Sequence, residues 1–430
     1  MALTEKINGY SKNTFVRRVG LVSVSKIILT LSSIVLLPIL TKTLPVSEYA
    51  IWVLFLVIIG LLMPIADIGL TTAMLRFFPT ETTKELTDKF QTIFLFILTS
   101  SVLISALLIL TSQQTANYLF DGRAEIIKYI AFLFPVIVLN NVCMSYFRAR
   151  QQIKRLTAFT IIQSVAVTGM VCIAVLSSPN LMQAIGAYGI GQIILFWIMY
   201  GLIIKEIGFG SVDFKRLKEY LSFGYPALPQ AIAGWMITGS DKFIIGMFLG
   251  ITYVGYYAPA YGLGSAVLLF MAPLGTLLPS ALSELQDTGR EVEMWARVRQ
   301  SIIIFFILSC LSGLVISLFA KNILELLTTP EIAENSYTIV PMIVVASIVY
   351  GCQAILSNVL IVKKRIGVMA KITIISAVIG LGANFIFIKQ LGIFGASLSL
   401  YIMYVVMGLL TMYSVFKLNW KKDGTQCESN

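Results

Sequence analysis

The 430-residue chain has no histidine and is poor in charge, since only 12% of its residues are Asp, Glu, Lys or Arg. The lack of histidine excludes histidine metal ligands, histidine general bases and Ser-His-Asp triads. A soluble domain carries about 25% charged residues, whereas 57% of this chain is hydrophobic. The few cysteines have neither metal-ligand nor disulfide spacing. The composition therefore predicts no metal site and indicates an integral membrane protein.

Long apolar runs, by contrast, are abundant. About 20 apolar residues in a helix cross the hydrocarbon core of a bilayer. Runs of this kind lie at 20–41, 49–74, 90–111, 126–147, 157–177, 182–204, 221–248, 253–282, 299–320, 335–362, 366–388 and 392–416. The connections between them reach only roughly 15 residues, which leaves no room for an extramembrane catalytic domain. We predict an all-α integral membrane protein with about twelve transmembrane helices, and no enzyme.

Lys and Arg alternate along the chain in a way that sets its orientation. With both termini in the cytoplasm, about 24 of the 32 Lys and Arg residues fall on cytoplasmic segments and about 6 at the outer ends of spans. This bias predicts a multi-pass protein of the cell membrane with both termini cytoplasmic. It also accounts for the net charge of +11 without a nucleic-acid partner.

The two halves of the chain resemble each other. LPVSEYAIW (44–52) aligns without gaps on LGITYVGYY (249–257), and RQQIKRLTAFTII (150–162) aligns on KKRIGVMAKITII (363–375). Each half would hold six spans and begin inside, so we expect two six-helix bundles related by a pseudo-two-fold axis along the membrane normal. The predicted parts are an N-terminal bundle (1–206), a cytoplasmic interfacial linker (207–220), a C-terminal bundle (221–418) and a cytoplasmic tail (419–430).

The stretch Leu221–Gly264 is unusual for a span that only anchors a protein. It carries Pro226, Pro229, several glycines and the acid–base pair Asp241–Lys242. An ionised side chain within the bilayer costs about 2.5–3.5 kcal/mol even on lenient insertion scales, so such groups tend to face a bundle interior or a water-filled cavity. Pro and Gly weaken a helix, and a membrane helix tolerates them where neighbouring helices or water satisfy the freed backbone groups. The stretch therefore predicts a bent helix beside a wet cavity.

Few intramembrane charges are available to bind a ligand. The substrate-binding candidates are Lys26, Asp67, Asp241 and Lys242. Each has a structural alternative: Lys26, like Lys371, lies near a cytoplasmic end and can snorkel to the interface, and Asp241 can form a buried pair with a neighbouring helix. Because adjacent helical residues are about 100° apart, Asp241 and Lys242 are not expected to aim at one ligand atom.

Uncharged polar side chains also recur inside the spans. They include Asn140, Gln163, Gln192 and Asn384, together with tyrosines at 253, 256, 257 and 261. Amides and aromatic rings suit a sugar-bearing cargo. They serve equally as interhelical hydrogen bonds and as an aromatic belt at the interface, and the sequence leaves both interpretations open.

Four segments together resemble a known family. They are ILTKTLPVSEYAIW (39–52), ADIGLTTAMLRFF (66–78), LSFGYPALPQ (221–230) and SDKFIIGMFLGITYVGYYAPAYGL (240–263). The chain resembles, over essentially its whole length, the polysaccharide flippases of the multidrug/oligosaccharidyl-lipid/polysaccharide exporter superfamily. It departs from the pattern at Lys242, where Arg is the commoner residue. The lipid II members of this superfamily have a fourteen-span plan, so the twelve spans predicted here count against assigning the chain to them.

This resemblance implies a flippase that moves polyprenyl-pyrophosphate-linked oligosaccharide from the cytoplasmic to the outer leaflet by alternating access. Membrane lipids and glycan-assembly proteins would be its partners. Lys26 and Lys242 are the cations expected to meet a pyrophosphate, while Asp67 and Asp241 are candidates for a coupling ion, H⁺ or Na⁺; no cofactor is expected. The alternatives are a cation-coupled multidrug antiporter of the same fold and a membrane glycan polymerase or ligase, which the short outer connections disfavour.

Overall fold

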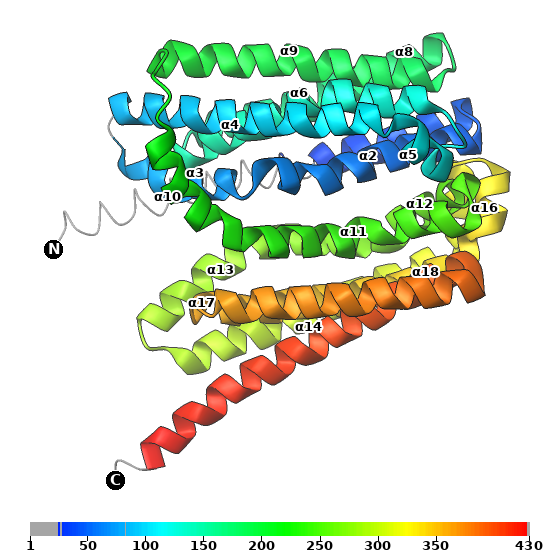
Figure 1. Cartoon of the computed structure of the whole chain (residues 1–430). Coiled ribbons are helices and arrows are strands. Elements are labelled where there is room, and N and C mark those ends of the chain that lie inside the picture. Colours follow the sequence, from blue (N-terminus) through cyan, green and yellow to red (C-terminus); the bar gives the residue numbers. More distant parts are fainter. Residues whose placement is uncertain (1–24, 26–27, 82, 428–430) are drawn as a thin grey trace. The chain divides into compact units, whose positions relative to one another are not determined.

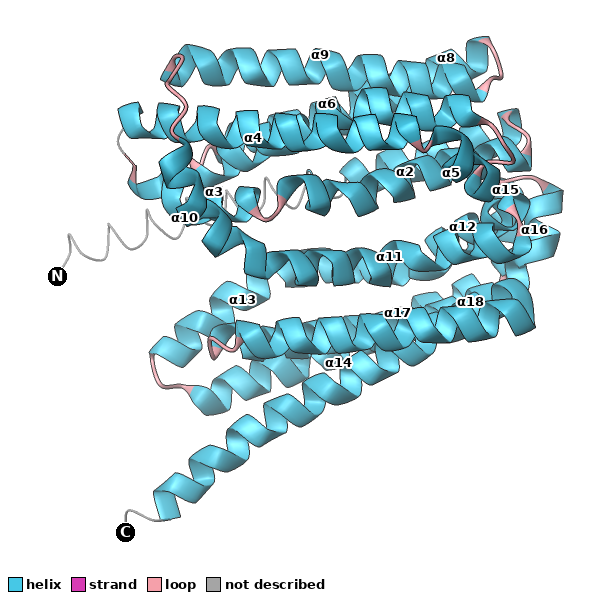
Figure 2. Ribbon diagram, in the orientation of Figure 1, coloured by secondary structure: helices cyan, strands magenta, loops and turns pink. Residues whose placement is uncertain are grey.

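The computed structural model describes residues 25, 28–81 and 83–427, and every regular element among them is helical. Figure 2 shows these helices joined by short loops, with no strand in the described ranges. The chain forms two compact units, the first ending at Ile232 and the second beginning at Ala233. The boundary lies within α11 (Leu228–Leu249), twelve residues after the end of the predicted linker.

The first unit contains the helix Ile28–Thr43 and a series of further helices. These are α2 (Val46–Asp67), α3 (Leu70–Phe77), η1 (Phe78–Thr80), α4 (Thr83–Leu110), α5 (Ser112–Leu119), α6 (Ala124–Ala149), α7 (Ile153–Ile162), η2 (Gln163–Val167), α8 (Thr168–Ser177), α9 (Leu181–Ile207), α10 (Phe214–Gly224) and η3 (Tyr225–Ala227). Helices α4, α6 and α9 run side by side (Figure 1). Their contact is largely aromatic, as where Phe94 stacks on Tyr200 with ring centroids 4.9 Å apart.

The second unit begins within α11 (Leu228–Leu249). It continues through α12 (Ile251–Ser265), η4 (Ala266–Phe270), α13 (Met271–Asp287), α14 (Glu291–Leu318), α15 (Ala320–Leu327), α16 (Pro330–Ser336), η5 (Tyr337–Ile339), α17 (Val340–Val362) and α18 (Ile366–Cys427). Helix α17 packs against α14 and α18 (Figure 1). Gly351 allows the close approach of α14, because a Cβ there would lie 2.1 Å from the Phe305 ring.

Ten helices in the described residues are long and apolar enough to cross a membrane. One of them is α18, which is two helices joined at a kink where Gly392 has φ 63° and ψ −141°. The shorter apolar helix Ile28–Thr43 completes the set. The structure thus accounts for all twelve predicted segments and confirms the all-α, multi-pass membrane fold.

The second predicted span, 49–74, is not one continuous helix. It is divided into α2 and α3 by Ile68 and Gly69, which have φ values of 48° and 75°. A side chain at Gly69 would also have no room, because its Cβ would lie 2.2 Å from the carbonyl oxygen of Gly224 at the end of α10. Helices α3 and α10 pack together (Figure 1), so the break lets two backbones touch.

The segment predicted as an interfacial linker is fastened to the first unit. Residues 208–213 run without helical structure, and α10 follows them. The backbone N–H of Ser211 donates to Asp88 Oδ1 at 2.7 Å, and that of Asp213 donates to Thr92 Oγ1 at 2.9 Å. Gly210 lies so close to α4 that a Cβ would meet the Asp88 backbone nitrogen at 2.8 Å. The linker is therefore held on α4 by specific contacts.

Candidate functional site

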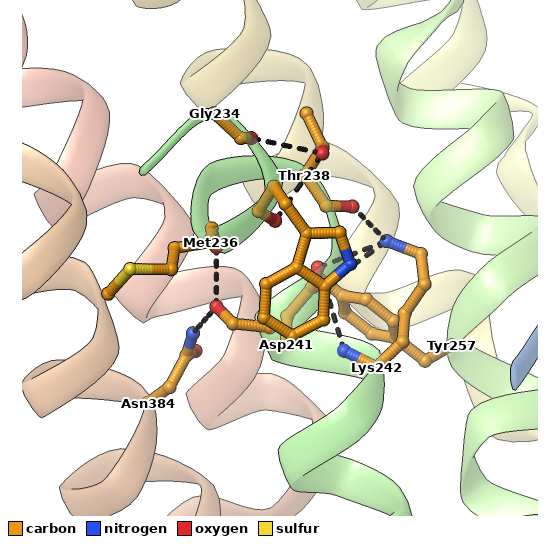
Figure 3. A network of polar contacts seen from close by, with 9 residues as sticks. Gly234, Met236, Thr238, Asp241, Lys242, Tyr257 and Asn384 are labelled. Atoms are coloured by element: carbon orange, nitrogen blue, oxygen red, sulfur yellow. Dashed lines mark hydrogen bonds and ion pairs between the residues drawn. The ribbon is translucent and has the colours of Figure 1, made fainter. Parts of the chain in front are cut away.

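A polar network lies inside the second unit, around Asp241 and Lys242 of α11 (Figure 3). Both residues are buried, with 3% and 7% of their surface exposed. The 1.5 Å rise per helical residue places Asp241 about 12 Å before the C-terminal end of α11. At this depth in a membrane helix an unpaired charge would be costly, so the question is what each charged group contacts.

The carboxylate of Asp241 accepts hydrogen bonds at both oxygens. The Lys242 ammonium lies 3.1 Å from Oδ1 and 3.3 Å from Oδ2. The hydroxyl of Tyr257, from α12, donates to Oδ2 at 2.8 Å, and the backbone N–H of Lys242 donates to Oδ1 at 2.8 Å. The carboxylate is thus held by donors from its own helix and from the next one.

The ammonium of Lys242 is equally well surrounded. Besides the Asp241 oxygens, it donates to the carbonyl oxygen of Thr238, one turn earlier, at 3.1 Å. It also lies over the ring of Tyr261 at 3.8 Å from the centroid, and over that of Tyr257 at 5.6 Å. All three ammonium protons have acceptors, and the ring faces add cation–π attraction.

Helices α17 and α18 close the network. Tyr404 of α18 packs against Tyr350 of α17 with ring centroids 4.7 Å apart, and both residues lie near Tyr261 of α12. On the other side of α11, the amide nitrogen of Asn384 donates to the Ser240 hydroxyl at 3.3 Å (Figure 3). The network thus joins α11, α12, α17 and α18 around one buried ion pair.

Within the second unit, the structure brings together two of the predicted site residues, Asp241 and Lys242. Their side chains turn toward each other, so the expected divergence of adjacent helical positions does not keep them apart. Asp241 also has a partner on a neighbouring helix, because Tyr257, which donates to its Oδ2, comes from α12. Lys26 lies outside the described residues, and Lys371 is exposed.

Asp67 lies in the first unit and has a local role. Its Oδ1 accepts the backbone N–H of Thr71 at 2.9 Å, and its Oδ2 accepts the Thr71 hydroxyl at 2.7 Å. The N–H groups of the first turn of a helix have no partner within that helix. Asp67, placed just before the break, satisfies one of these groups at the start of α3.

Two amides flagged in the sequence meet inside the first unit. The side-chain nitrogen of Asn140 on α6 donates to the Gln192 backbone oxygen at 2.9 Å and to Gln192 Oε1 at 2.8 Å. Asn140 is 2% exposed and Gln192 1%. The two amides thus form an interhelical hydrogen bond, one of the two roles that the sequence left open for them. The helix beside them contains the π-helical turn η2.

The partners of the ion pair were the part that sequence reasoning missed. The sequence groups Tyr257 and Tyr261 with other tyrosines at the outer end of their spans, as sugar contacts or as an aromatic belt, and it does not single out Tyr404. A usable signal existed for Tyr257: α11 and α12 are joined at Gly250, so residues at similar distances on either side of the turn lie at similar depth. Tyr404, far away in the chain, had no such signal.

The described residues contain no group of three or more His, Cys, Asp or Glu side chains that could hold a metal ion. The chemistry offered by the Asp241 network is electrostatic: a carboxylate and an ammonium group are in direct contact within a membrane helix bundle.

Comparison with known proteins gives a family and a fold. The model of the family described as "Polysaccharide biosynthesis protein" matches residues 39–329. The chain is 20% identical over 365 residues to a probable low-salt glycan biosynthesis flippase, Agl15, of Haloferax volcanii, covering 83% of this chain and 74% of that protein. It is 25% identical over 185 residues to the teichuronic acid biosynthesis protein TuaB of Bacillus subtilis, covering 41% and 37%.

Two solved structures share the fold at low sequence identity. An inward-facing multidrug resistance MATE family transporter of the MOP superfamily superposes with a TM-score of 0.73 and 15% identity, over 91% of this chain and 95% of that one. The lipid II flippase MurJ, in an inward closed conformation, gives 0.74 and 12%, over 91% and 87%. With a family match over residues 39–329 and ten helices in its described part that are long and apolar enough to span a bilayer, the chain is a multi-pass membrane protein that belongs to the family described as "Polysaccharide biosynthesis protein".

Proposed function

We propose that this protein is a flippase that moves polyprenyl-pyrophosphate-linked oligosaccharide from the cytoplasmic to the outer leaflet during polysaccharide biosynthesis. The observation that carries the proposal is the family match over residues 39–329 on a chain whose described residues hold ten helices long and apolar enough to cross a membrane. The relatives Agl15 and TuaB, named for glycan biosynthesis, support it. The protein acts as a transporter, not as an enzyme.

The physical problem explains why such a protein is needed. A pyrophosphate and its sugars carry charge and hydroxyl groups, and moving them through hydrocarbon without partners costs many kcal/mol. A flippase supplies polar contacts along the way while the polyprenyl tail stays in the lipid. Lys26 and Lys242 are the proposed positive charges for the pyrophosphate. Lys242 can take that role only when its ammonium leaves Asp241, because all its protons are engaged there.

The remaining features of the proposal follow from the sequence. The protein lies in the cell membrane with both termini cytoplasmic, as the Lys and Arg bias indicates. Membrane lipids and glycan-assembly proteins are its partners, and nucleic acid is not. An ion gradient, of H⁺ or Na⁺, drives the alternation of access. The predicted ion-binding carboxylates, Asp67 and Asp241, both have protein donors at both oxygens, so an ion has to displace them.

Multidrug antiport is the second candidate, and the likeness to a MATE transporter is what favours it. That likeness lies at 15% identity and shows the fold alone. The family match and both curated relatives point to glycan biosynthesis instead. Deleting an antiporter would sensitise cells to drugs, whereas deleting the proposed flippase would deplete surface glycan.

The decisive experiment combines gene deletion with reconstitution. We expect deletion in the host to reduce surface glycan and to trap lipid-linked oligosaccharide on the cytoplasmic leaflet, with wild-type complementation as the control. Purified protein in liposomes should expose a polyprenyl-pyrophosphate-linked oligosaccharide to an external glycosidase, whereas protein-free liposomes should not. Normal surface glycan without a trapped precursor, together with no exposure in liposomes, would refute the function.

A further inference from the structure

The Asp241 carboxylate has its charge neutralised within the protein. Each oxygen accepts two hydrogen bonds, and the Lys242 ammonium contributes to both. A carboxylate in a membrane helix otherwise needs a proton or a bound cation, because a bare negative charge is expensive there. Here a neighbouring side chain supplies that positive charge.

The position of the ammonium is that of a bound cation. Its neighbours are two carboxylate oxygens, the Thr238 carbonyl oxygen and the face of Tyr261. Carboxylate and carbonyl oxygens are typical ligands of hard cations, and a tyrosine face attracts ammonium ions. The site therefore has the chemistry of a monovalent-cation site.

The side chain of Lys242 reaches this position by turning inward. A lysine near a span end can instead extend to the interface, where its ammonium is hydrated. Lys242 is 7% exposed and donates to Thr238, four residues before it in the chain. This follows the tilt of helical side chains toward the N-terminus, and Tyr261 of α12 lies on the ammonium.

We propose that the Lys242 ammonium is the resident cation of a monovalent-cation site built by Asp241, Thr238 and Tyr261. Because the ammonium is covalently tethered one residue from the carboxylate, its effective concentration there exceeds that of a free ion in solution. In this conformation, where the Lys242 ammonium occupies the site, the wild-type protein therefore takes no external Na⁺, Li⁺ or ammonium at Asp241; an ion could enter only in a transport state in which Lys242 has left. Shortening Lys242 opens the site to such ions.

The test compares unfolding temperatures in detergent, without cargo, so its outcome is independent of the proposed flippase function. Wild-type, Lys242→Ala, Lys242→Met and Asp241→Asn/Lys242→Ala proteins are heated in chloride salts of ammonium, Na⁺, Li⁺ or choline at one ionic strength. Lys242→Ala removes the positive charge and leaves an empty space where the lysine side chain was. Lys242→Met removes the charge but fills the space, and the double variant lacks the carboxylate.

We expect only Lys242→Ala to be stabilised by a small cation, with a saturable rise of several degrees in ammonium, Na⁺ or Li⁺ relative to choline. The unfolding temperature of the wild-type protein should be the same in all four salts. The proposal is overturned if no small cation raises the unfolding temperature of Lys242→Ala, or if Lys242→Met or the double variant responds equally. A saturable Na⁺ or Li⁺ stabilisation of the wild-type protein that Asp241→Asn abolishes would also overturn it, even if Lys242→Ala could not be purified.

Discussion

Neutralising Asp241 and Lys242 separately and together measures what the buried pair contributes to stability. The variants are Asp241→Asn, Lys242→Met and the double variant, which are close in volume to the residues they replace. Each single change leaves one buried charge without its partner. The double change leaves none, so the two effects should not add.

The contacts allow the magnitudes to be estimated. Removing one partner of a buried ion pair costs about 3–5 kcal/mol. We expect Asp241→Asn near the lower end, because the ammonium keeps the Thr238 carbonyl and the Tyr261 face, and a desolvated cation–π contact contributes about 2 kcal/mol. Lys242→Met leaves a carboxylate with the Tyr257 hydroxyl and one backbone N–H, and should cost at least as much.

The double variant should lose only about 1–2 kcal/mol, because replacing both ions by neutral groups of similar volume is often nearly neutral. It should then be at least about 4 kcal/mol more stable than the sum of the single effects predicts. Unfolding free energies from SDS titration in mixed micelles measure this difference. If the single effects add within about 0.5 kcal/mol, Asp241 and Lys242 are not each other's main partners and the reasoning fails.

Two further predictions concern the first unit. Gly224→Ala should lower the yield and unfolding temperature of the folded protein, because its Cβ would lie 2.6 Å from the Gly69 carbonyl oxygen; Gly262→Ala, with nothing within 4 Å of its Cβ, is the matched control and should be tolerated. Asn140→Ala should cost about 1–2 kcal/mol, since it removes two buried interhelical hydrogen bonds. Adding Gln192→Ala to it should cost less than Gln192→Ala alone, and equal costs would show that the two amides are not coupled.

The number and type of membrane helices could be predicted from the sequence because they depend on local quantities. A run of about 20 apolar residues has to be helical in a bilayer, where every backbone group needs a partner within the chain. Interruptions were harder to predict. The break between α2 and α3 at Ile68 and Gly69 depends on the approach of Gly224, a contact across more than 150 residues that no local pattern encodes.

For the candidate site, too, some features depend on local sequence and others on tertiary contacts. The sequence alone determined that Asp241 and Lys242 lie within a membrane-spanning stretch, since the length of the apolar run and the position of the charges in it are local facts. Only the tertiary structure decided that the two charges neutralise each other, because that outcome depends on Tyr257 and Tyr261, which α12 brings to the pair. Burial by neighbouring helices makes the pairing of charges favourable, and burial is a property of the packed fold.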